Sequence, residues 1–348
     1  MPTLDTLGDF RFHVRQSLGK LSSVLRPKEA VSVVIPAYNA ASFIVDALNS
    51  VNRQTLQPAE LLVVDDGSSD RTIEVVEAWR TATQPAFDVQ LLRQRNAGAP
   101  AARNMGIRRA TSPWVALLDA DDVWEPEHAA TLMDAVAHAP GAVAAYGGGR
   151  LLVNGVVQEG LYDEYWDSPS RHFGVPLGAG SAYLRIDFRA FARLAKGNFI
   201  KPSSLMFAKD LAMSVGLFNE TLRSAEDREF LVRLLRAGDF VYAPQAITQY
   251  RWHDDNLSHG RNARRNSENA LRALKLIAEN AELQLGPDER QACKQVVGEA
   301  AVGYLYLSAR EGRQAYLEGL RFLAASFGRG LVLRSLRPKH LLRLIVRA

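Results

Sequence analysis

The chain of 348 residues has one cysteine and no long hydrophobic run. Cys293 cannot form a disulfide within the chain, and no Cys/His cluster has the spacing of a zinc site. The longest apolar runs, such as residues 31–35, are far shorter than the roughly 20 residues that cross a membrane, and no signal-peptide core is present at the N-terminus. These absences exclude a disulfide scaffold and lead us to expect a cytoplasmic protein.

Acidic residues are missing from the C-terminal end. Residues 319–348 contain seven Lys or Arg and no Asp or Glu, and residues 1–28 contain five basic residues against two acidic ones. Since the whole chain carries a net charge of only +4, the region between its ends is acidic. A nucleic-acid-binding protein would have cations along its main surface, so we expect no nucleic-acid partner.

Both ends have an amphipathic pattern. Apolar residues recur at spacings of three and four along residues 4–25, which predicts a helix over residues 1–28 that docks on the protein's own core or on a membrane. Residues 331–348 interleave leucines with cations. This tail favours a peripheral position on an anionic membrane surface, on the inner face of the cell membrane.

Between the ends, apolar segments of strand length alternate with helical stripes. This alternation predicts an α/β fold with a parallel sheet, which binds ligands beyond the carboxyl ends of its strands. The predicted strands are residues 31–35, 60–64, 89–92 and 114–118, and the first helices include residues 71–80 and 100–110. Residues 145–198 are expected to form loops and short strands over the sheet edge. We predict three parts: an N-terminal helix (1–28), an α/β domain (29–258), and a helical C-terminal region (259–348) with helices over 267–280, 287–310 and 314–327.

The loop after the first strand contains no glycine. A dinucleotide-binding enzyme would have G-x-G-x-x-G at this point, and a nucleotidyltransferase would have a phosphate loop rich in Gly, Lys and Arg. The sequence instead reads Pro36-Ala37-Tyr38-Asn39. Tyr38 either stacks on a nucleobase or packs within the protein.

Two strands end in clusters of carboxylates. Asp65 and Asp66 follow the second strand, where they either cap a turn or accept a hydrogen bond from a base. Asp119, Asp121 and Asp122 follow the fourth, and three carboxylates in four positions repel one another unless a positive partner lies between them. Because carboxylate oxygens suit Mg²⁺ and Mn²⁺, we favour a metal site over an ordinary acidic turn.

Another acidic pair precedes a helical stripe. Glu226 and Asp227 either cap this helix or supply a general base, with Arg233 one to two turns later. The α/β region closes on residues 250–253, an aromatic and cationic cluster that includes His253 and is able to hold phosphate.

Five segments, in this order, resemble the family 2 glycosyltransferases with the GT-A fold. They cover about residues 30–258 and read VSVVIPAYN (31–39), VVDDGSSDRT (63–72), RNAGAPAARNMGI (95–107), LLDADDVWEP (117–126) and GLFNE followed by AEDREFLVRL (216–234). The resemblance implies a GT-A fold with a mostly parallel sheet, and it does not extend to residues 1–28 or 260–348. The Q-x-x-R-W motif of processive synthases is missing from its expected place, so a nonprocessive enzyme is implied.

The resemblance also implies a role for each candidate residue. Nucleotide and donor contacts would come from Pro36, Tyr38, Asp65, Asp66, Asn96, Gly98, Arg103, Asp119 and Ala120. A divalent Mn²⁺ or Mg²⁺ would bind Asp121, assisted by Asp119 and His253. Asp227 would be the catalytic base, with Ser203, Ser204, Glu226 and Arg233 near the acceptor or donor sugar.

The sequence thus predicts a metal-dependent, inverting glycosyltransferase that moves a sugar from a nucleotide-diphosphate sugar, a UDP-sugar in the first place, to a lipid-linked or envelope glycan. A nucleotide-sugar-binding protein without turnover and a nucleotidyltransferase on a similar sheet are the alternatives. Intact Asp119, Asp121 and Asp227 argue against the first alternative, and the loop at residues 36–39 argues against the second. Homo-oligomer formation is left open.

Overall fold

The computed structural model describes residues 30–161, 173–253, 260–340 and 343. The chain divides into two compact units. The first unit contains the described residues up to 190 together with 199–218 and 233–251, and the second contains 191–198, 219–232 and the described residues from 252 onward. The helix expected over residues 1–28, and tail residues 341, 342 and 344–348, lie outside the described part of the chain.

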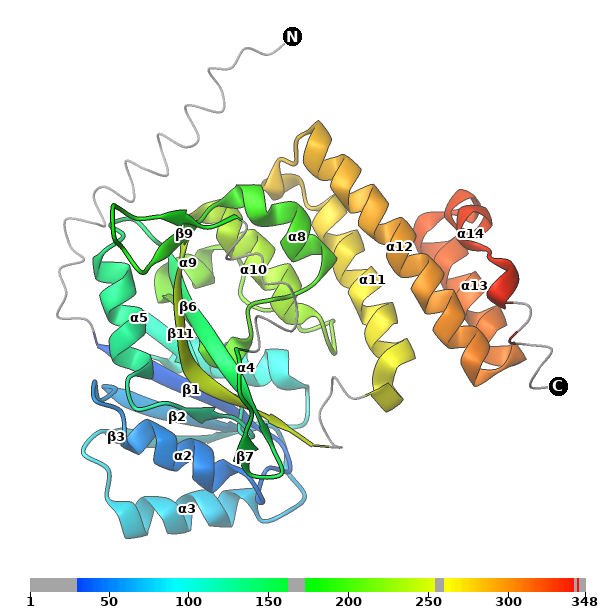
Figure 1. Cartoon of the computed structure of the whole chain (residues 1–348). Coiled ribbons are helices and arrows are strands. Elements are labelled where there is room, and N and C mark those ends of the chain that lie inside the picture. Colours follow the sequence, from blue (N-terminus) through cyan, green and yellow to red (C-terminus); the bar gives the residue numbers. More distant parts are fainter. Residues whose placement is uncertain (1–29, 162–172, 254–259, 341–342, 344–348) are drawn as a thin grey trace. The chain divides into compact units, whose positions relative to one another are not determined.

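The N-terminal half of the first unit is a parallel sheet (Figure 1). Its strands lie in the spatial order β3-β2-β1-β4 and are β1 (Val31–Ala37), β2 (Glu60–Asp65), β3 (Asp88–Arg93) and β4 (Trp114–Leu117). The connecting helices are α2 (Ile44–Asn52), α3 (Thr72–Thr83) and α4 (Ala99–Arg109). β1, β2 and β4 are buried along their whole length, which explains why each one reads as a continuous apolar run. The four predicted strands are all present.

Antiparallel strands extend this sheet beyond β4. β10 (Leu205–Ala208) pairs with β4, and the order continues through β6 (Ala144–Val153), β11 (Phe240–Trp252), β9 (Leu184–Ile186) and β8 (Val175–Pro176). The short strands β5 (Val123–Trp124) and β7 (Val156–Val157) pair with β11 and β6. The remaining elements outside the helical region are α5 (His128–Ala137), α9 (Lys209–Ser214) and the single 3₁₀ turns η1 (Phe188–Ala190) and η2 (Pro202–Ser204).

The expectation that residues 145–198 lie over the sheet edge is wrong for β6, which is a long strand inside the sheet. Its glycines explain the error. A Cβ added to Gly147 would lie 2.3 Å from Cδ1 of Ile247, and one added to Gly149 would lie 2.3 Å from Cε2 of Tyr250. Large side chains of β11 therefore occupy the space that β6 leaves open, and the glycines remove the apolar alternation that marks a strand in sequence.

The second unit is helical. It contains α8 (Phe191–Lys196), the first part of α10 (Glu226–Ala237), and then α11 (Ala263–Glu279), α12 (Pro287–Glu311), α13 (Arg313–Phe327) and α14 (Arg329–Ser335), with 3₁₀ turns η3 (Gly260–Asn262) and η4 (Ala281–Leu283). α11, α12 and α13 correspond to the three predicted helices, and α11 packs against α12 (Figure 1). Their core includes Leu274, Tyr304 and Leu323.

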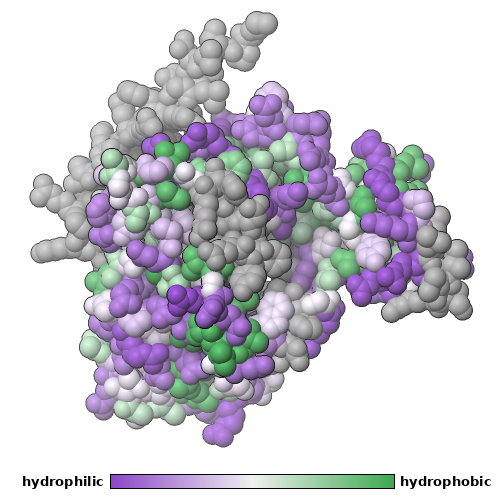
Figure 2. All heavy atoms as spheres, in the orientation of Figure 1, coloured by the Kyte–Doolittle hydropathy of each residue, from purple (hydrophilic) through white to green (hydrophobic). Residues whose placement is uncertain are grey.

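The C-terminal leucines divide between the interior and the surface of this unit. Leu331 of α14 is buried, whereas Leu333 and Leu336 are exposed. The expected membrane role of the tail stays a prediction. None of the helices in the described ranges is both long and apolar enough to span a membrane. On the face seen in Figure 2, hydrophilic residues predominate and hydrophobic ones occur in small patches.

Candidate functional site

The loops that follow β1 and β2 are joined by hydrogen bonds. Asn39 has a left-handed backbone with φ of 49°, a conformation that asparagine tolerates better than most residues. Its N–H donates to Oγ of Ser68 at 2.9 Å, and its Oδ1 accepts the N–H of Ser69 at 2.8 Å. Tyr38, the preceding residue, is 53% exposed. The strand end therefore presents an aromatic ring to solvent from a fixed backbone.

Asp66 holds the next loop along the edge. Its buried carboxylate accepts hydrogen bonds from Nε2 of Gln94 at 2.7 Å and from the N–H groups of Ala97 and Gly98, both at 2.8 Å. Gly67 has a φ of +73°, and a Cβ there would lie 2.9 Å from the N atom of Asn96. Close packing of these two loops therefore requires glycine. The sequence assigned Asp66 to the nucleobase, and its role in holding this loop was missed because it depends on contacts 28 to 32 residues away.

Three other predicted donor-binding residues lie in or beside this loop. Asp65 is fully buried, and its Oδ2 lies 3.6 Å from Nε of Arg93. Asn96 is exposed, and Gly98 is the N-cap of α4 with a φ of 96°. The N–H groups at the start of a helix carry partial positive charge, so this corner can accept an anion.

Arg103 on α4 binds the loop after β4. Its Nη2 lies 2.7 Å from Oδ1 of Asp119, and its guanidinium lies over the ring of Phe218 at 5.5 Å. Phe218 is fixed in turn by Asn104, whose side-chain amide exchanges two hydrogen bonds with the Phe218 backbone at 2.8 and 3.0 Å. Arg103 is almost completely buried, so in this structure it positions Asp119.

Residues 118–122 connect β4 to β5 and contain Asp119, Asp121 and Asp122, and we call them the acidic loop. Asp122 is its buried carboxylate. Its carboxylate accepts a 2.5 Å hydrogen bond from Oγ of Ser203 and a 2.9 Å bond from the N–H of Arg251. Burial raises the pKa of Asp122 well above its ordinary value, and the negative charges of Asp121 and Asp119 raise it further. No role was predicted for Asp122 from the sequence, because its partners come from distant parts of the chain.

The acidic loop fits a divalent cation by its donor chemistry. Asp121 is partly exposed, and Nε of Arg251 donates to its carbonyl oxygen at 2.8 Å, which fixes the backbone between Asp119 and Asp122. Hard carboxylate oxygens are the ligands that Mg²⁺ and Mn²⁺ take together with substrate phosphates. In the described ranges, no three His, Cys, Asp or Glu side chains are grouped so that they could hold a metal ion. Asp121 and Asp119 are the candidate ligands for such a cation.

The predicted base lies in the second unit. Asp227 is in the first turn of α10, where its Oδ1 accepts the N–H of Arg228 at 2.7 Å and its Oδ2 accepts Nδ2 of Asn198 at 2.5 Å. Burial lowers the pKa of Arg228, and the neighbouring Asp227 charge opposes that change. Two donors therefore fix the orientation of the Asp227 carboxylate.

The remaining predicted residues are placed as follows. Ser203 and Ser204 form the η2 turn before β10, and Oγ of Ser204 donates to the Lys201 carbonyl at 3.0 Å. The guanidinium of Arg233 donates to the carbonyls of Val215 and Leu217 within the first unit. Pro36 is a buried residue of β1, and Ala120 is buried within the acidic loop. Glu226 is buried at the start of α10, and His253 belongs to the second unit.

Residues 32–164 match the sequence model of the family described as Glycosyl transferase family 2. Among curated proteins, the uncharacterized glycosyltransferase YibD of Escherichia coli (strain K12) is 41% identical over 103 residues, which are 30% of this chain and 29% of YibD. The chain spans about a third of the length of the curated relatives it matches.

Two solved structures resemble nearly the whole chain. S. aureus TarS 1–349, crystallised with UDP-GlcNAc, has a TM-score of 0.62 at 18% identity, with 91% of each chain covered. The mannosyltransferase PcManGT from Pyrobaculum calidifontis, in complex with GDP-Man and Mn²⁺, has a TM-score of 0.55 at 18% identity and covers 98% of this chain and 96% of its own. At this identity the likeness shows the fold, and the predicted GT-A architecture is confirmed.

Proposed function

We propose that this chain, whose residues 32–164 belong to glycosyl transferase family 2, transfers a sugar from a nucleotide-diphosphate sugar to an acceptor hydroxyl. The acidic loop after β4 carries the proposal. Arg103 and Ser203 hold Asp119 and Asp122 on this loop at the carboxyl end of a parallel strand. β4 pairs with β1, whose end carries Tyr38, and a parallel sheet binds its ligand at this edge.

The donor nucleotide that fits this edge best is a uridine diphosphate. Tyr38 offers an exposed ring on which a base can stack. A carboxylate has about four acceptor positions, and Asp66 uses three of them on the loop at residues 94–98. One position is left for the imide N–H of a pyrimidine, as in uracil or, less well supported, thymine.

Negative charge develops on the leaving diphosphate during transfer, and the carboxylates after β4 would hold a cation that offsets this charge. When bound there, a divalent cation would supply Lewis-acid stabilisation of the negative charge on the leaving diphosphate. Asp121 and Asp119 would hold this cation, and the Arg103 guanidinium keeps the Asp119 carboxylate in place at 2.7 Å. Arg251 fixes the loop backbone through the carbonyl of Asp121.

Asp227 is proposed as the base that takes the proton from the acceptor hydroxyl. Asn198 and the N–H of Arg228 orient its two oxygens, so the carboxylate is held ready for one direction of approach. A single base that activates the acceptor implies direct displacement, which inverts the anomeric centre.

The acceptor that we propose is a lipid-linked or envelope glycan, modified in a nonprocessive reaction by a protein peripheral to the inner face of the membrane. The basic C-terminal tail supports this placement, because Leu333 and Leu336 are exposed among its cations.

A donor screen tests the function. Purified full-length chain is incubated with UDP-, GDP- and dTDP-sugars in Mn²⁺ or Mg²⁺, and release of the nucleoside diphosphate is measured. We expect metal-dependent hydrolysis of at least one UDP-sugar. Binding of donors without release of any nucleoside diphosphate, even with added glycan acceptors, would favour a nucleotide-sugar-binding protein without turnover.

A further inference from the structure

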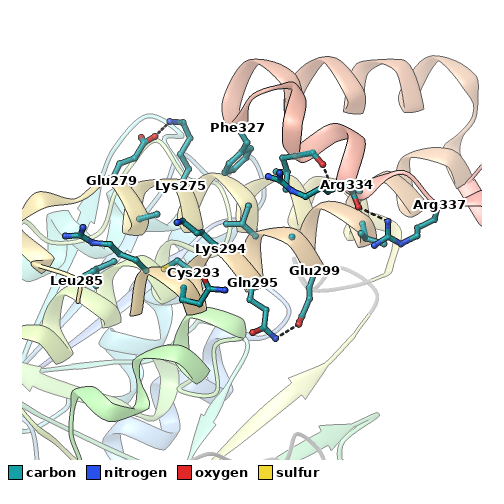
Figure 3. Close-up of a pocket in the computed structure, with 18 residues that line it drawn as sticks. Lys275, Glu279, Leu285, Cys293, Lys294, Gln295, Glu299, Phe327, Arg334 and Arg337 are labelled. Atoms are coloured by element: carbon teal, nitrogen blue, oxygen red, sulfur yellow. Dashed lines mark hydrogen bonds and ion pairs between the residues drawn. The ribbon is translucent and has the colours of Figure 1, made fainter. Parts of the chain in front are cut away.

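The second unit contains a groove of about 1070 Å³ lined by α11, α12, α14 and the end of α13 (Figure 3). We call it the helical groove. Its apolar lining includes Leu285, Cys293, Val297, Phe327 and Leu331. Ligand pockets typically measure 300–1,000 Å³ and are mostly apolar, so the helical groove is large enough for an extended hydrocarbon chain.

The charged residues of the helical groove are mostly cations. The lining contains five Lys or Arg and only two carboxylates, Glu279 and Glu299. Glu279 pairs with Lys275, and Glu299 accepts Nε2 of Gln295 at 3.0 Å (Figure 3). Glu299 also lies 3.4 Å from Nζ of Lys196. Both acids are thus already partnered within the protein.

Four groove cations are left without a carboxylate partner. Across the described ranges, no carboxylate lies within ion-pair distance of Arg290, Lys294, Arg334 or Arg337. The Arg337 guanidinium donates instead to the carbonyls of Arg334 and Leu336, which leaves Arg290, Lys294 and Arg334 as the cations open to a ligand. An apolar lining beside unbalanced positive charge is complementary to a molecule that is apolar at one end and anionic at the other.

The two ends of the chain lack the negative charge that a ligand of the helical groove would need. Residues 1–28 carry five basic residues against two acidic ones, and residues 341–348 carry two Arg and no acid. Either end would bring positive charge to a positive groove. We propose that the helical groove binds an anionic amphiphile with one long hydrocarbon chain, its chain against the apolar lining and its head group near Arg290, Lys294 and Arg334. This site is independent of the proposed transfer reaction.

Calorimetry on the full-length chain without donor tests the ligand class. The probes are dodecyl phosphate below its micelle concentration, dodecyl maltoside as the uncharged chain, and inorganic phosphate as the isolated head. We expect dodecyl phosphate to bind one to one and at least tenfold tighter than either other probe, and to weaken at high salt because exposed charges are screened. No binding of dodecyl phosphate, or equal binding of dodecyl maltoside, would overturn the proposal.

Two glycines of α12 provide a matched pair for locating the site. Gly298 lines the groove and Gly303 does not, and an added Cβ would have no atom within 4 Å at either position. Gly298→Phe should fill the groove and weaken dodecyl phosphate binding at least tenfold, while Gly303→Phe should leave it unchanged. Both replace a mid-helix glycine, so helix content by circular dichroism should be kept. Equal affinities in the two variants would place the ligand elsewhere.

Cys293 supplies a second readout of the same groove. It is the only cysteine, and burial together with the Glu289 charge raises its pKa to about 11. Its alkylation by N-ethylmaleimide should therefore be slow, and saturating dodecyl phosphate should slow it at least a further fivefold, whereas inorganic phosphate should not. An alkylation rate unchanged by saturating dodecyl phosphate would exclude the helical groove as its site.

Discussion

The hydroxyl of Ser203 donates a 2.5 Å hydrogen bond to the buried carboxylate of Asp122. The same oxygen accepts the N–H of Asp119 at 3.0 Å, and the carbonyl of Ser203 accepts Nε1 of Trp124 at 2.6 Å. Ser203 is therefore bonded to three positions along the acidic loop and its continuation. This relationship fixes the shape of the loop.

Removing that hydroxyl should loosen the loop. Ser203→Ala leaves the Asp122 carboxylate without its hydroxyl donor, and losing a partner for a buried polar group costs about 1–3 kcal/mol of stability. We expect a lower melting temperature and at least tenfold weaker binding of UDP in Mn²⁺ by calorimetry. Ser204→Ala is the matched control, because that buried neighbour donates only to the Lys201 carbonyl. Folded Ser203→Ala that binds UDP like the unmodified chain would show that the loop does not need Ser203.

Substitutions of two aspartates should separate donor binding from transfer. Asp121→Asn removes a charge from the proposed cation site, so metal-dependent UDP binding should be lost. Asp227→Asn removes only the proposed base, so UDP binding should remain while transfer falls about 10²- to 10⁴-fold. Calorimetry and product formation are measured on both variants. Substantial transfer by Asp227→Asn would show that another group accepts the proton.

Binding of the nucleobase should depend on the ring of Tyr38 and on the remaining acceptor position of the Asp66 carboxylate. Tyr38→Ala should weaken UDP binding by about 1–3 kcal/mol, the usual loss when an aromatic ring is removed from under a base, whereas Tyr38→Phe should keep it. In calorimetry with Mn²⁺, UDP should bind more tightly than GDP or CDP. The reverse order would contradict the pyrimidine imide assignment.

Local pattern was enough to predict the strands and loops that carry these residues. β1, β2 and β4 are wholly buried, so each reads as a continuous apolar run, and their carboxyl ends locate Tyr38, Asp66 and the acidic loop. The long strands β6 and β11 were not predicted. Gly147 and Gly149 carry no side chain to show alternation, and the segment forms a strand through pairing with β10 and β11, which lie far away in the sequence.

Long-range partners account for what the sequence could not show at the site. Asp119, Asp121 and Asp122 look alike in sequence, and they differ in the structure because Arg103, Ser203 and Arg251 reach them from 16 to 130 residues away. His128 is a further example. Nothing local marks it as buried, yet its ring stacks on Trp124 with centroids 3.9 Å apart, and its Nδ1 lies 3.0 Å from the Ile247 carbonyl.

This buried histidine should make stability depend on pH. Burial lowers the pKa of His128 to about 3, far below the 6.5 of a free histidine, so the unfolded chain takes up the proton first. The contribution of His128 to the free energy of unfolding is therefore fully present above about pH 6.5. It falls by about 1.4 kcal/mol per pH unit as the pH drops toward 3. Thermal melts between pH 7 and 5 should show the decline, which His128→Phe should reduce. An unaltered slope in a folded His128→Phe variant would assign the pH dependence to other groups.

Membrane binding by the C-terminal tail can be tested without dismantling the helical unit. Deleting residues 329–348 would remove Leu331, which is buried, so a loss of function could reflect unfolding alone. Leu333 is 71% exposed and Leu336 is also exposed, so Leu333→Ser with Leu336→Ser removes apolar contact area and leaves the interior intact. Leu317→Ser, at another exposed leucine on α13, is the control.

We expect the full-length chain to sediment with anionic vesicles at low salt and to be released as salt rises, because each cation near such a surface contributes about 1 kcal/mol that salt screens. The double leucine variant should bind less, and Leu317→Ser should bind like the unmodified chain. Gly298→Phe should also sediment normally, because a filled groove leaves the exposed leucines and cations in place. If the full-length chain does not sediment with anionic vesicles at low salt, the membrane role is excluded. Low salt screens the cations least, so these conditions favour binding by the cations and the exposed leucines most.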